Sequence, residues 1–241
     1  TKKLERHDIN FNAMLMNRIR ILLILLLTLC ETVPVEAQML SADARRMAAQ
    51  GLKNVADEVP EVRISLMYTR ADNFTGRVLY TSLREAYLHP ITMKALKKAD
   101  ERLRQLRPDL RLMVMDATRP MSVQQKMWDA VKNTNQKIYV SNPKNGGGLH
   151  NYGLAVDLTL CDLNGDTLTM GVKIDNMTSL SHIDKEDLLL KQGKISREAY
   201  DNRRLLREVM RYAGFKPLRT EWWHFNIRTR AQAKQYFKVV E

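Results

Sequence analysis

The sequence predicts a single α+β domain with a mainly antiparallel sheet flanked by helices. Segments with strand-like and helix-like spacing of apolar residues follow one another without a regular βαβ repeat. The dipeptide Asn164-Gly165 follows an alternating segment and favours a hairpin turn, hence antiparallel pairing. The 241 residues are 44% hydrophobic, which is enough for one substantial core. We expect that core in residues 38–241.

Two strands and one helix are expected in the first half of this domain. Apolar and polar residues alternate through residues 62–68, as in a half-buried strand, and a loop follows at residues 73–76. An amphipathic helix begins at Pro90 and ends before Pro108, because proline is favoured at the first helical position and disfavours a helical residue before it. The chain then returns as a strand at residues 110–116.

A second helix and a long loop come next. Ser122 and Gln125 have the spacing of a capping box, which predicts a helix over residues 123–132. Residues 133–148 are polar and end in three consecutive glycines, as is typical of a loop. This loop leads into the most regular strand of the sequence.

The last part of the chain alternates strand, helix and strand. Residues 154–160 place leucine and valine on one face and small or polar residues on the other, and the Asn-Gly turn follows. A long helix runs from its cap Ser196 to Gly214, where glycine can adopt the left-handed conformation. Apolar and polar residues alternate again in residues 223–227, which predicts a final strand.

Residues 1–37 have the pattern of a signal peptide, preceded by an upstream extension. Arg18 and Arg20 come before an apolar run at residues 21–27 that is too short to cross a bilayer. Small or modest side chains at residues 35 and 37 indicate a signal-peptidase site, so Gln38 would be the first mature residue. Residues 1–15 precede an alternative start at Met16. We therefore expect an exported, periplasmic protein, with lipidation at Cys30 as the alternative.

The chain is basic, with a formal net charge of +12. No cluster of five to eight Lys or Arg residues and no basic–aromatic interleaving is present, so nucleic acid is not an expected partner. Attraction to an anionic cell wall or membrane surface accounts for the charge equally well. Removal of the signal would leave Cys161 as a lone thiol, which excludes a disulfide framework.

Three side chains have the types and placement of a metal site on the sheet. A catalytic zinc ion takes three protein ligands from His, Asp or Glu and leaves the fourth position to water. His150 lies on the glycine loop, Asp157 on the polar face of the strand that follows, and His224 on the polar face of the last strand. If these two strands are neighbours, the three side chains can bind one zinc ion per chain.

Two further residues could complete a hydrolytic site. Glu221 lies three residues before His224, and strand alternation would send the two to opposite faces. We therefore expect Glu221 in a bend beside the metal, where a carboxylate can act as general base for water. Arg119 follows the strand at residues 110–116, and Pro120 favours an extended backbone there. Its guanidinium could stabilise a developing oxyanion.

The combination of these segments resembles the D-alanyl-D-alanine dipeptidases, which belong to a zinc peptidase superfamily that also contains D,D-carboxypeptidases. The signature comprises Gly-Leu-His-Asn-Tyr-Gly-Leu-Ala-Val-Asp at residues 148–157 and Glu-Trp-Trp-His-Phe at residues 221–225. The likeness extends from residue 52 to residue 228. Within it, further similar blocks lie at residues 68–77, 116–120 and 170–182.

The resemblance implies a role for each matching residue. It makes His150, Asp157 and His224 the zinc ligands, Glu221 the catalytic base and Arg119 the arginine that stabilises the transition state. It also implies that Tyr68 and Asp175 bind the free amino group of a small peptide such as D-Ala-D-Ala.

Two departures from the family pattern leave rival functions open. Gly148 stands where the family has a serine that binds the substrate carboxylate, although backbone N–H groups of the glycine loop could replace it. Ile174 replaces an aromatic residue before Asp175. The missing serine keeps open a D,D-carboxypeptidase that acts on peptidoglycan stem peptides. A non-catalytic, zinc-stabilised wall-binding module is the alternative of another class, and the oligomeric state is undetermined.

Overall fold

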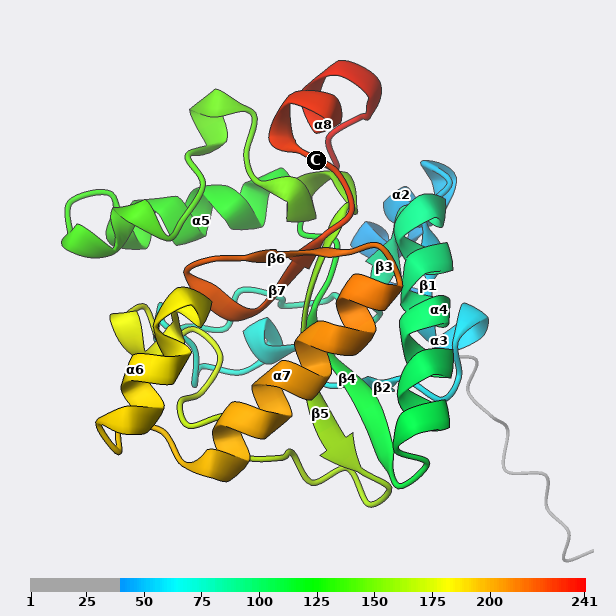
Figure 1. The fold of residues 1–241 in the computed structure, drawn as a ribbon. Coiled ribbons are helices and arrows are strands. Elements are labelled where there is room, and N and C mark those ends of the chain that lie inside the picture. The colour runs from blue at the N-terminus through cyan, green and yellow to red at the C-terminus, as the bar shows by residue number, and fades with distance from the viewer. Residues whose placement is uncertain (1–39) are drawn as a thin grey trace, which may run out of the picture. The chain divides into compact units, whose positions relative to one another are not determined.

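The computed structural model describes residues 40–241, and their centre is a five-stranded sheet with strand order β2-β4-β5-β7-β6 (Figure 1). Strand β2 pairs with β4 in parallel, and every other neighbouring pair in this sheet is antiparallel. The prediction of one α+β domain with a mainly antiparallel sheet is confirmed. The strands are β2 (Arg63–Ile64), β4 (Leu110–Asp116), β5 (Ala155–Asp162), β7 (Glu221–Asn226) and β6 (Lys216–Leu218).

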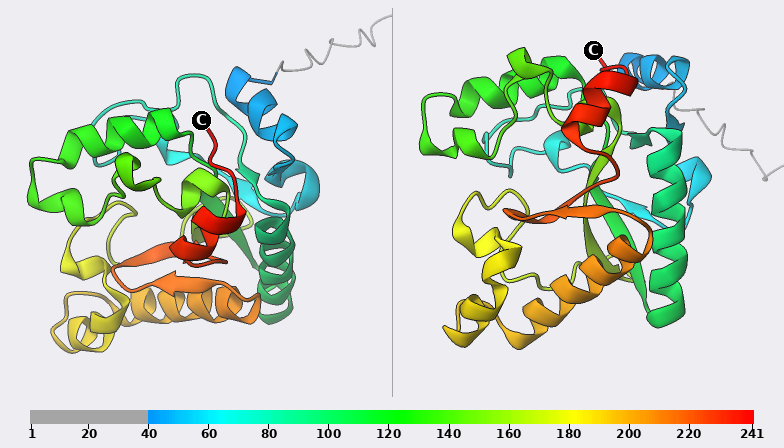
Figure 2. Two further views of the ribbon diagram at one scale, coloured as in Figure 1. Left: turned by 90° about the horizontal axis from the view of Figure 1, so that it is seen from above. Right: turned by 45° about the horizontal axis from the view of Figure 1, so that its top comes forward.

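Two long helices pack against the central strands of the sheet. Helix α4 (Pro90–Leu106) packs against α7 (Arg197–Tyr212), and the two contact β4 and β5 respectively. In the view from above, α7 lies on one side of the sheet and α5 (Met121–Val131) on the other (Figure 2). Seven of the eight residues of β5 are buried, which places this strand at the centre of the core.

The predictions for α4, β4 and α7 are confirmed. Pro90 occupies the first turn of α4, and β4 has the bounds expected from the sequence. Ser196 Oγ accepts a hydrogen bond of 3.0 Å from the backbone N–H of Ala199 at the start of α7. Gly214 follows the helix with φ of +96°, the left-handed conformation that ends helices.

The strand expected at residues 62–68 is wrong for most of its length. Only Arg63–Ile64 pair with the sheet, and a 3₁₀ turn, η1 (Met67–Thr69), follows. Alternation correctly indicates a half-buried segment, but this edge strand has only two partners on β4. The chain then turns inward and buries Tyr68, which is 2% exposed. This turn brings Tyr68 to the site described below.

The capping box predicted at Ser122 is also wrong, although the helix exists. Helix α5 begins at Met121, after Pro120, and no side chain caps it. The carbonyl of Pro120 accepts hydrogen bonds from the N–H groups of Val123 and Gln124, at 3.0 and 3.1 Å. Pro120 therefore starts the helix earlier than a serine cap would, and Gln124 becomes buried.

The expected loop and hairpin turn are both present. Residues 133–148 contain two short 3₁₀ turns, η2 (Asn135–Ile138) and η3 (Pro143–Asn145). After β5, the N–H of Asp162 donates to the Asp166 carbonyl at 2.9 Å, and Gly165 has φ of +95°. The returning chain forms a single bridge, from Cys161 to Thr167, rather than a full strand.

The remaining elements complete the domain. Residues 237–241 follow the last helix and fold back over the loops near α5. The N–H of Met121 donates to the Val240 carbonyl, and the N–H of Val240 donates to the Asn151 carbonyl, both at 2.8 Å. The other elements are α2 (Ala42–Ala49), β1 (Lys53–Asn54), α3 (Val55–Glu58), β3 (Tyr87–Leu88), η4 (Leu149–Tyr152), η5 (Ser179–Ser181), η6 (Ile183–Lys185), α6 (Glu186–Lys191) and α8 (Arg230–Tyr236).

The predicted signal peptide and its cleavage site at Gln38 lie outside the described residues. Between residues 40 and 241, no helix is both long and apolar enough to cross a membrane. Cys161 is a free, buried thiol in this part of the chain.

The turn that ends at Gly153 lies close to the start of α4. Replacement of Gly153 tests how closely these two segments approach each other. It has φ of +67°, and an added Cβ would lie 2.8 Å from the backbone nitrogen of His89. Gly153→Ala should therefore lower the free energy of unfolding by about 3 kcal/mol, from backbone strain and overpacking together. Urea unfolding measures the change.

Gly193→Ala is the matched control, because Gly193 has φ of +64° but no atom within 4 Å of the added Cβ. It should lose only the backbone term, about 1 kcal/mol. Equal losses in the two variants would contradict the close approach at Gly153.

Candidate active site

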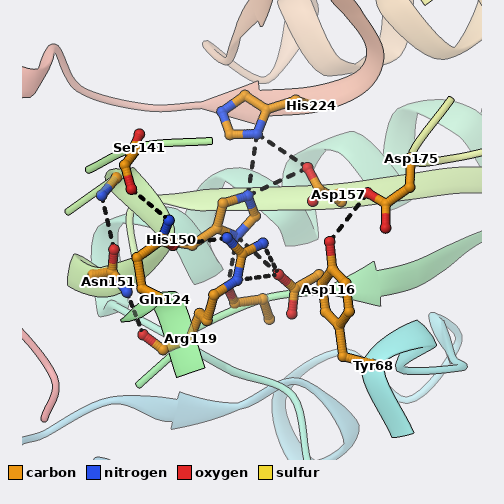
Figure 3. Close-up of polar contacts among 12 residues, drawn as sticks. Tyr68, Asp116, Arg119, Gln124, Ser141, His150, Asn151, Asp157, Asp175 and His224 are labelled. Carbon is orange, nitrogen blue, oxygen red and sulfur yellow. Dashed lines mark hydrogen bonds and ion pairs between the residues drawn. The ribbon is translucent and has the colours of Figure 1, made fainter. Parts of the chain in front are cut away.

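Three side-chain atoms from distant parts of the chain form a triangle in the core of the site. His150 Nε2 lies 3.1 Å from His224 Nδ1 and 3.3 Å from Asp157 Oδ1, and the last two atoms are 3.0 Å apart (Figure 3). The three residues are 5%, 3% and 9% exposed, in the order His150, Asp157, His224. The three residues that the sequence analysis placed on one metal ion therefore do converge.

The sheet register places two of these residues, and the glycine loop places the third. Asp157 on β5 and His224 on β7 are direct partners in the antiparallel ladder, so their side chains share one face. The expectation that these strands are neighbours is confirmed. His150 lies on η4, which begins after Gly148 and ends at Gly153 in the left-handed conformation.

The hydrogen bonds of His150 direct a lone pair toward the triangle. Its Nδ1 lies 2.7 Å from the Ala117 carbonyl, which can only accept, so Nδ1 carries the proton. In the neutral ring Nε2 is then the free acceptor, as for a metal-bound histidine held by a carbonyl. This contact fixes both the tautomer and the orientation of the ring.

The triangle has the dimensions of a zinc-type site. Ligands about 2.0–2.1 Å from a tetrahedral ion lie about 3.3 Å from one another, and the three observed separations are 3.0–3.3 Å. Two imidazole nitrogens and one carboxylate oxygen also form a donor set that zinc accepts. The group formed by His150, Asp157 and His224 could therefore hold a metal ion.

The charges in the triangle favour a cation. Burial alone would raise the pKa of the Asp157 carboxyl, but His150 and His224 outweigh burial and hold that pKa far below its ordinary value. Burial lowers the pKa of His150, but the Asp157 and Asp116 carboxylates together raise it, and the net shift is upward. Asp157 is therefore an ionised, buried carboxylate that needs positive charge beside it.

The triangle opens into a cavity of about 190 Å³ that contains every residue predicted for the site. A deep cavity lined by several convergent polar groups is the usual form of a small-molecule site. Besides the three triangle residues, the predicted residues that line it are Tyr68, Arg119, Gly148, Asp175 and Glu221.

Comparison with known families identifies the chain. The family model described as D-Ala-D-Ala dipeptidase, peptidase family M15, matches residues 48–241. The chain belongs to this family. It is therefore an M15 metallopeptidase, and the His150, Asp157 and His224 group agrees with the metal dependence of that class.

Curated M15 relatives are similar over most or part of this chain. A D-alanyl-D-alanine dipeptidase of Escherichia coli K12 is 34% identical over 176 residues, 73% of this chain and 84% of the relative. One from Synechocystis is 30% identical over 173 residues, covering 60% of this chain and 70% of its own length. One from Enterococcus faecium is 34% identical over 89 residues, 36% of this chain and 41% of its own.

In this M15 domain, a buried ion-pair network holds Arg119. Its Nη2 and Nε donate to Asp116 Oδ2 at 2.5 and 3.1 Å, and Nη1 donates to Gln124 Oε1 at 2.9 Å. Burial lowers the pKa of Arg119, but Asp116 and the nearby phenols raise it well above its ordinary value. The guanidinium is thus permanently charged and fixed in the cavity wall, with N–H groups left over for a ligand.

At another part of the cavity wall, Tyr68 donates a hydrogen bond of 3.1 Å to Asp175 Oδ1. The second oxygen, Asp175 Oδ2, is buried and has no partner in the described residues. Burial, and then the charge of Asp157, raise the pKa of Asp175 to about 7. Asp175 also has φ of +64°, which is unusual for a residue other than glycine and is common at functional sites. The free oxygen is suited to accept from a bound cation such as an ammonium group.

Glu221 lies on a strand, which corrects the expectation of a bend. It is the first residue of β7, and it still lines the same cavity as His224. The register between β6 and β7 is irregular here: Pro217 pairs with Phe225, but the next β6 residue, Leu218, pairs with Glu221. Strict alternation therefore fails between Glu221 and His224, and residues with an odd spacing can reach one cavity.

The surroundings of Glu221 make its carboxyl a strong base for its type. Burial raises its pKa, His224 lowers it and Asp157 raises it again, which leaves the pKa at about 8. A general base is most effective when its pKa is close to the working pH. Glu221 is thus a buried carboxyl in the cavity that can exchange a proton near neutral pH.

Sequence reasoning assigned no role to Asp116, Gln124 or Ser141. Asp116 is fully buried and also accepts a hydrogen bond of 2.5 Å from Tyr80 Oη. A carboxylate that ends a buried strand is a possible signal for Asp116. No local signal marks Gln124 or Ser141, because they reach the cavity through the fold of the long loop. His182 does not line the cavity, but its Nε2 lies 3.1 Å from Oη of Tyr139, which does.

Removal of any triangle side chain should abolish metal binding. The parent protein should hold about one metal ion per chain, and His150→Ala, Asp157→Ala and His224→Ala should each lower metal content severely, because two ligands hold such an ion poorly. Elemental analysis of the purified proteins gives the occupancy. Added metal should raise the melting temperature of the parent and not of the variants.

The matched control for this experiment is His182→Ala, because that histidine lies outside the cavity. It should keep the parent's metal content. Full occupancy in all three triangle variants would exclude the site.

Proposed function

We propose that this protein is a zinc-dependent dipeptidase that hydrolyses the peptide bond of D-Ala-D-Ala. The observation that carries the proposal is the convergence of a metal-binding triangle, the carboxylate of Glu221 and the guanidinium of Arg119 in one small cavity. Family membership supports the substrate class. Zinc is the metal that best suits two imidazoles and one carboxylate with an open fourth position.

The residues divide the reaction between them. His150, Asp157 and His224 would hold the zinc ion, which would supply Lewis acidity to acidify water and polarise the scissile carbonyl. Glu221 accepts the proton of the attacking water and passes it to the nitrogen of the departing D-alanine. Arg119, held by Asp116, faces the oxyanion that develops on the scissile carbonyl oxygen and stabilises it without reorganising.

Tyr68 and Asp175 orient the substrate by its amino end. The unpaired Asp175 oxygen accepts a hydrogen bond from the substrate ammonium group, and the Tyr68 hydroxyl holds the Asp175 carboxylate in position. Charge-assisted hydrogen bonds of this kind are the stronger ones. A free amino group would thereby favour a dipeptide over a longer peptide.

Two other functions account for fewer of these features. A D,D-carboxypeptidase acting on stem peptides has no use for a buried carboxylate awaiting an ammonium group. A non-catalytic wall-binding module has no use for the raised pKa of Glu221 or for the charged, fixed Arg119. The preferred length of the peptide substrate therefore distinguishes a dipeptidase from a D,D-carboxypeptidase. Any catalytic turnover distinguishes both enzymes from a non-catalytic module.

Released D-alanine is the test of the activity and of its base. The parent should release D-alanine from D-Ala-D-Ala much faster than from a stem pentapeptide. Glu221→Gln should lower kcat by about 10²–10⁴-fold, because it keeps the size of the side chain but removes the proton acceptor. Its metal content should equal that of the parent.

Glu198→Gln, an exposed position in the first turn of α7, is the matched control and should keep full activity. A Glu221→Gln protein with near-parent activity would refute the base, and one without metal would make Glu221 a ligand.

We also propose that the protein is exported and acts in the periplasm, where its positive charge favours contact with anionic wall or membrane surfaces. The apolar run at residues 21–27 and the cleavage pattern ending at Ala37 support export. Protein recovered from a bacterial envelope should begin at Gln38, as read by mass spectrometry. A lipidated form beginning at Cys30 would refute the cleavage site and leave export standing.

A further inference from the structure

The Ser141 side chain occupies the space that a side chain on Gly148 would take. A Cβ built on Gly148 would lie 3.0 Å from Ser141 Oγ and 3.3 Å from Ser141 Cβ. Both residues line the cavity that contains the metal triangle. Ser141 therefore presents its hydroxyl where a side chain at position 148 would enter the cavity.

The backbone that carries Ser141 is fixed to the site, and its hydroxyl is left free. Gln124 Nε2 donates to the Ser141 carbonyl at 2.8 Å, and Gln124 Oε1 accepts from Arg119. Within residues 40–241 the Ser141 hydroxyl takes part in no hydrogen bond. A hydroxyl held in a polar cavity by a buried glutamine is available for a ligand.

Two backbone N–H groups of the glycine loop already have hydrogen-bond partners within the loop. The N–H of Gly146 donates to the Pro143 carbonyl at 2.9 Å, and the N–H of Gly148 donates to Asn151 Oδ1 at 2.7 Å. Both groups are therefore used inside the loop. The hydroxyl of Ser141 is a further donor toward the cavity from this region.

Arg230 brings positive charge to the cavity, and Asp175 lies on the opposite side of the triangle from Ser141. Arg230 lines the same cavity, and its Nη2 donates to the Asn145 carbonyl at 3.2 Å, next to the glycine loop. Figure 3 shows Ser141 on one side of the metal-binding triangle and Asp175 on the other. The cavity thus has a cationic, hydroxyl-bearing end and an acidic end, as a zwitterionic peptide requires.

We propose that Ser141 Oγ, together with the Arg230 guanidinium, binds the terminal carboxylate of the substrate and so specifies cleavage of the last peptide bond. This inference rests on the proposed peptidase function and assigns the carboxylate end, for which no other residue is placed. Ser141 is a specificity residue in this arrangement: it holds the substrate one residue away from the scissile carbonyl. A hydroxyl donor and a guanidinium are suited to a carboxylate, whereas a neutral amide gains less from both.

Ser141→Ala measures the contribution of the hydroxyl. KM for D-Ala-D-Ala should rise about 10- to 100-fold, the range for a hydrogen bond to a charged group, while kcat changes little. With D-Ala-D-alaninamide, whose carboxylate is neutralised, the same substitution should cost about threefold or less. This difference between substrates would not follow from a merely structural role.

An exchange of the two residues provides a rescue. Ser141→Gly removes the hydroxyl together with the Cβ that crowds position 148, and Gly148→Ser then supplies a hydroxyl from the other side of the same space. Gly148 has ordinary, negative φ of −107°, so serine fits its backbone. The exchanged protein should regain most of the KM lost by Ser141→Gly alone.

Ser122→Ala, on an exposed position of α5, is the matched control and should match the parent on both substrates. Metal content and melting temperature are measured for every variant to confirm folding. Equal losses on the acid and the amide, or a Ser141→Ala protein with unchanged KM, would overturn the carboxylate assignment. A parent that does not hydrolyse D-Ala-D-Ala would overturn the proposed function itself, and this is visible before any variant is made.

Discussion

The buried carboxylate of Asp116 is the contact on which the rest of the site depends. It ends β4 with no exposed surface, and an ionised group there is costly unless other groups satisfy it. Arg119 and Tyr80 donate to its two oxygens, and His150 Nδ1 lies 3.6 Å away. One carboxylate thus holds Arg119, the residue proposed to stabilise the oxyanion, and lies beside the ring of His150. Its own position depends on a bulge: Val114 is opposite Leu158, whereas Asp116 is opposite Asp157. The shift turns the end of β4 toward the site.

The metal-binding triangle and the groups proposed to bind the substrate come from different kinds of structure. Two of the three triangle residues, Asp157 and His224, are direct partners in the antiparallel pairing of β5 and β7, which fixes their relative positions. The groups expected to hold the substrate lie on loops and turns: Tyr68 on η1, and Asp175 and Ser141 outside regular elements. A rigid sheet that carries the chemistry and loops that select the substrate is a common division in enzymes. In a family with one chemistry, substrate range can then change through the loops alone.

Local signals were sufficient for the parts of the fold that local interactions determine. Proline at the start of α4, the Ser196 cap and the alternation in β5 identify their elements, because each acts within a few residues. The three triangle residues could be named because their combined segments resemble the family signature, whereas a single histidine or aspartate would not distinguish a ligand from a structural residue. Tyr68 was placed on a strand that does not form, since only two partners on β4 are available. Glu221 was moved off its strand, because a register irregularity leaves no trace in sequence spacing. Ser141 could not be found, as its proximity to Gly148 arises from tertiary folding of the long loop.

The segment at residues 237–241 has a consequence for how the site opens. Val240 is 1% exposed, and its backbone bridges the start of α5 to η4 through the bonds with Met121 and Asn151. Terminal segments of domains are commonly frayed, but this one is a strut between the helix that follows Arg119 and the turn that carries His150. Detachment of the strut would leave a buried N–H and a buried carbonyl without partners. The strut and the turn should therefore open together as one cooperative unit. A substitution in the strut, which has no chemical role, should then lower the affinity for the metal.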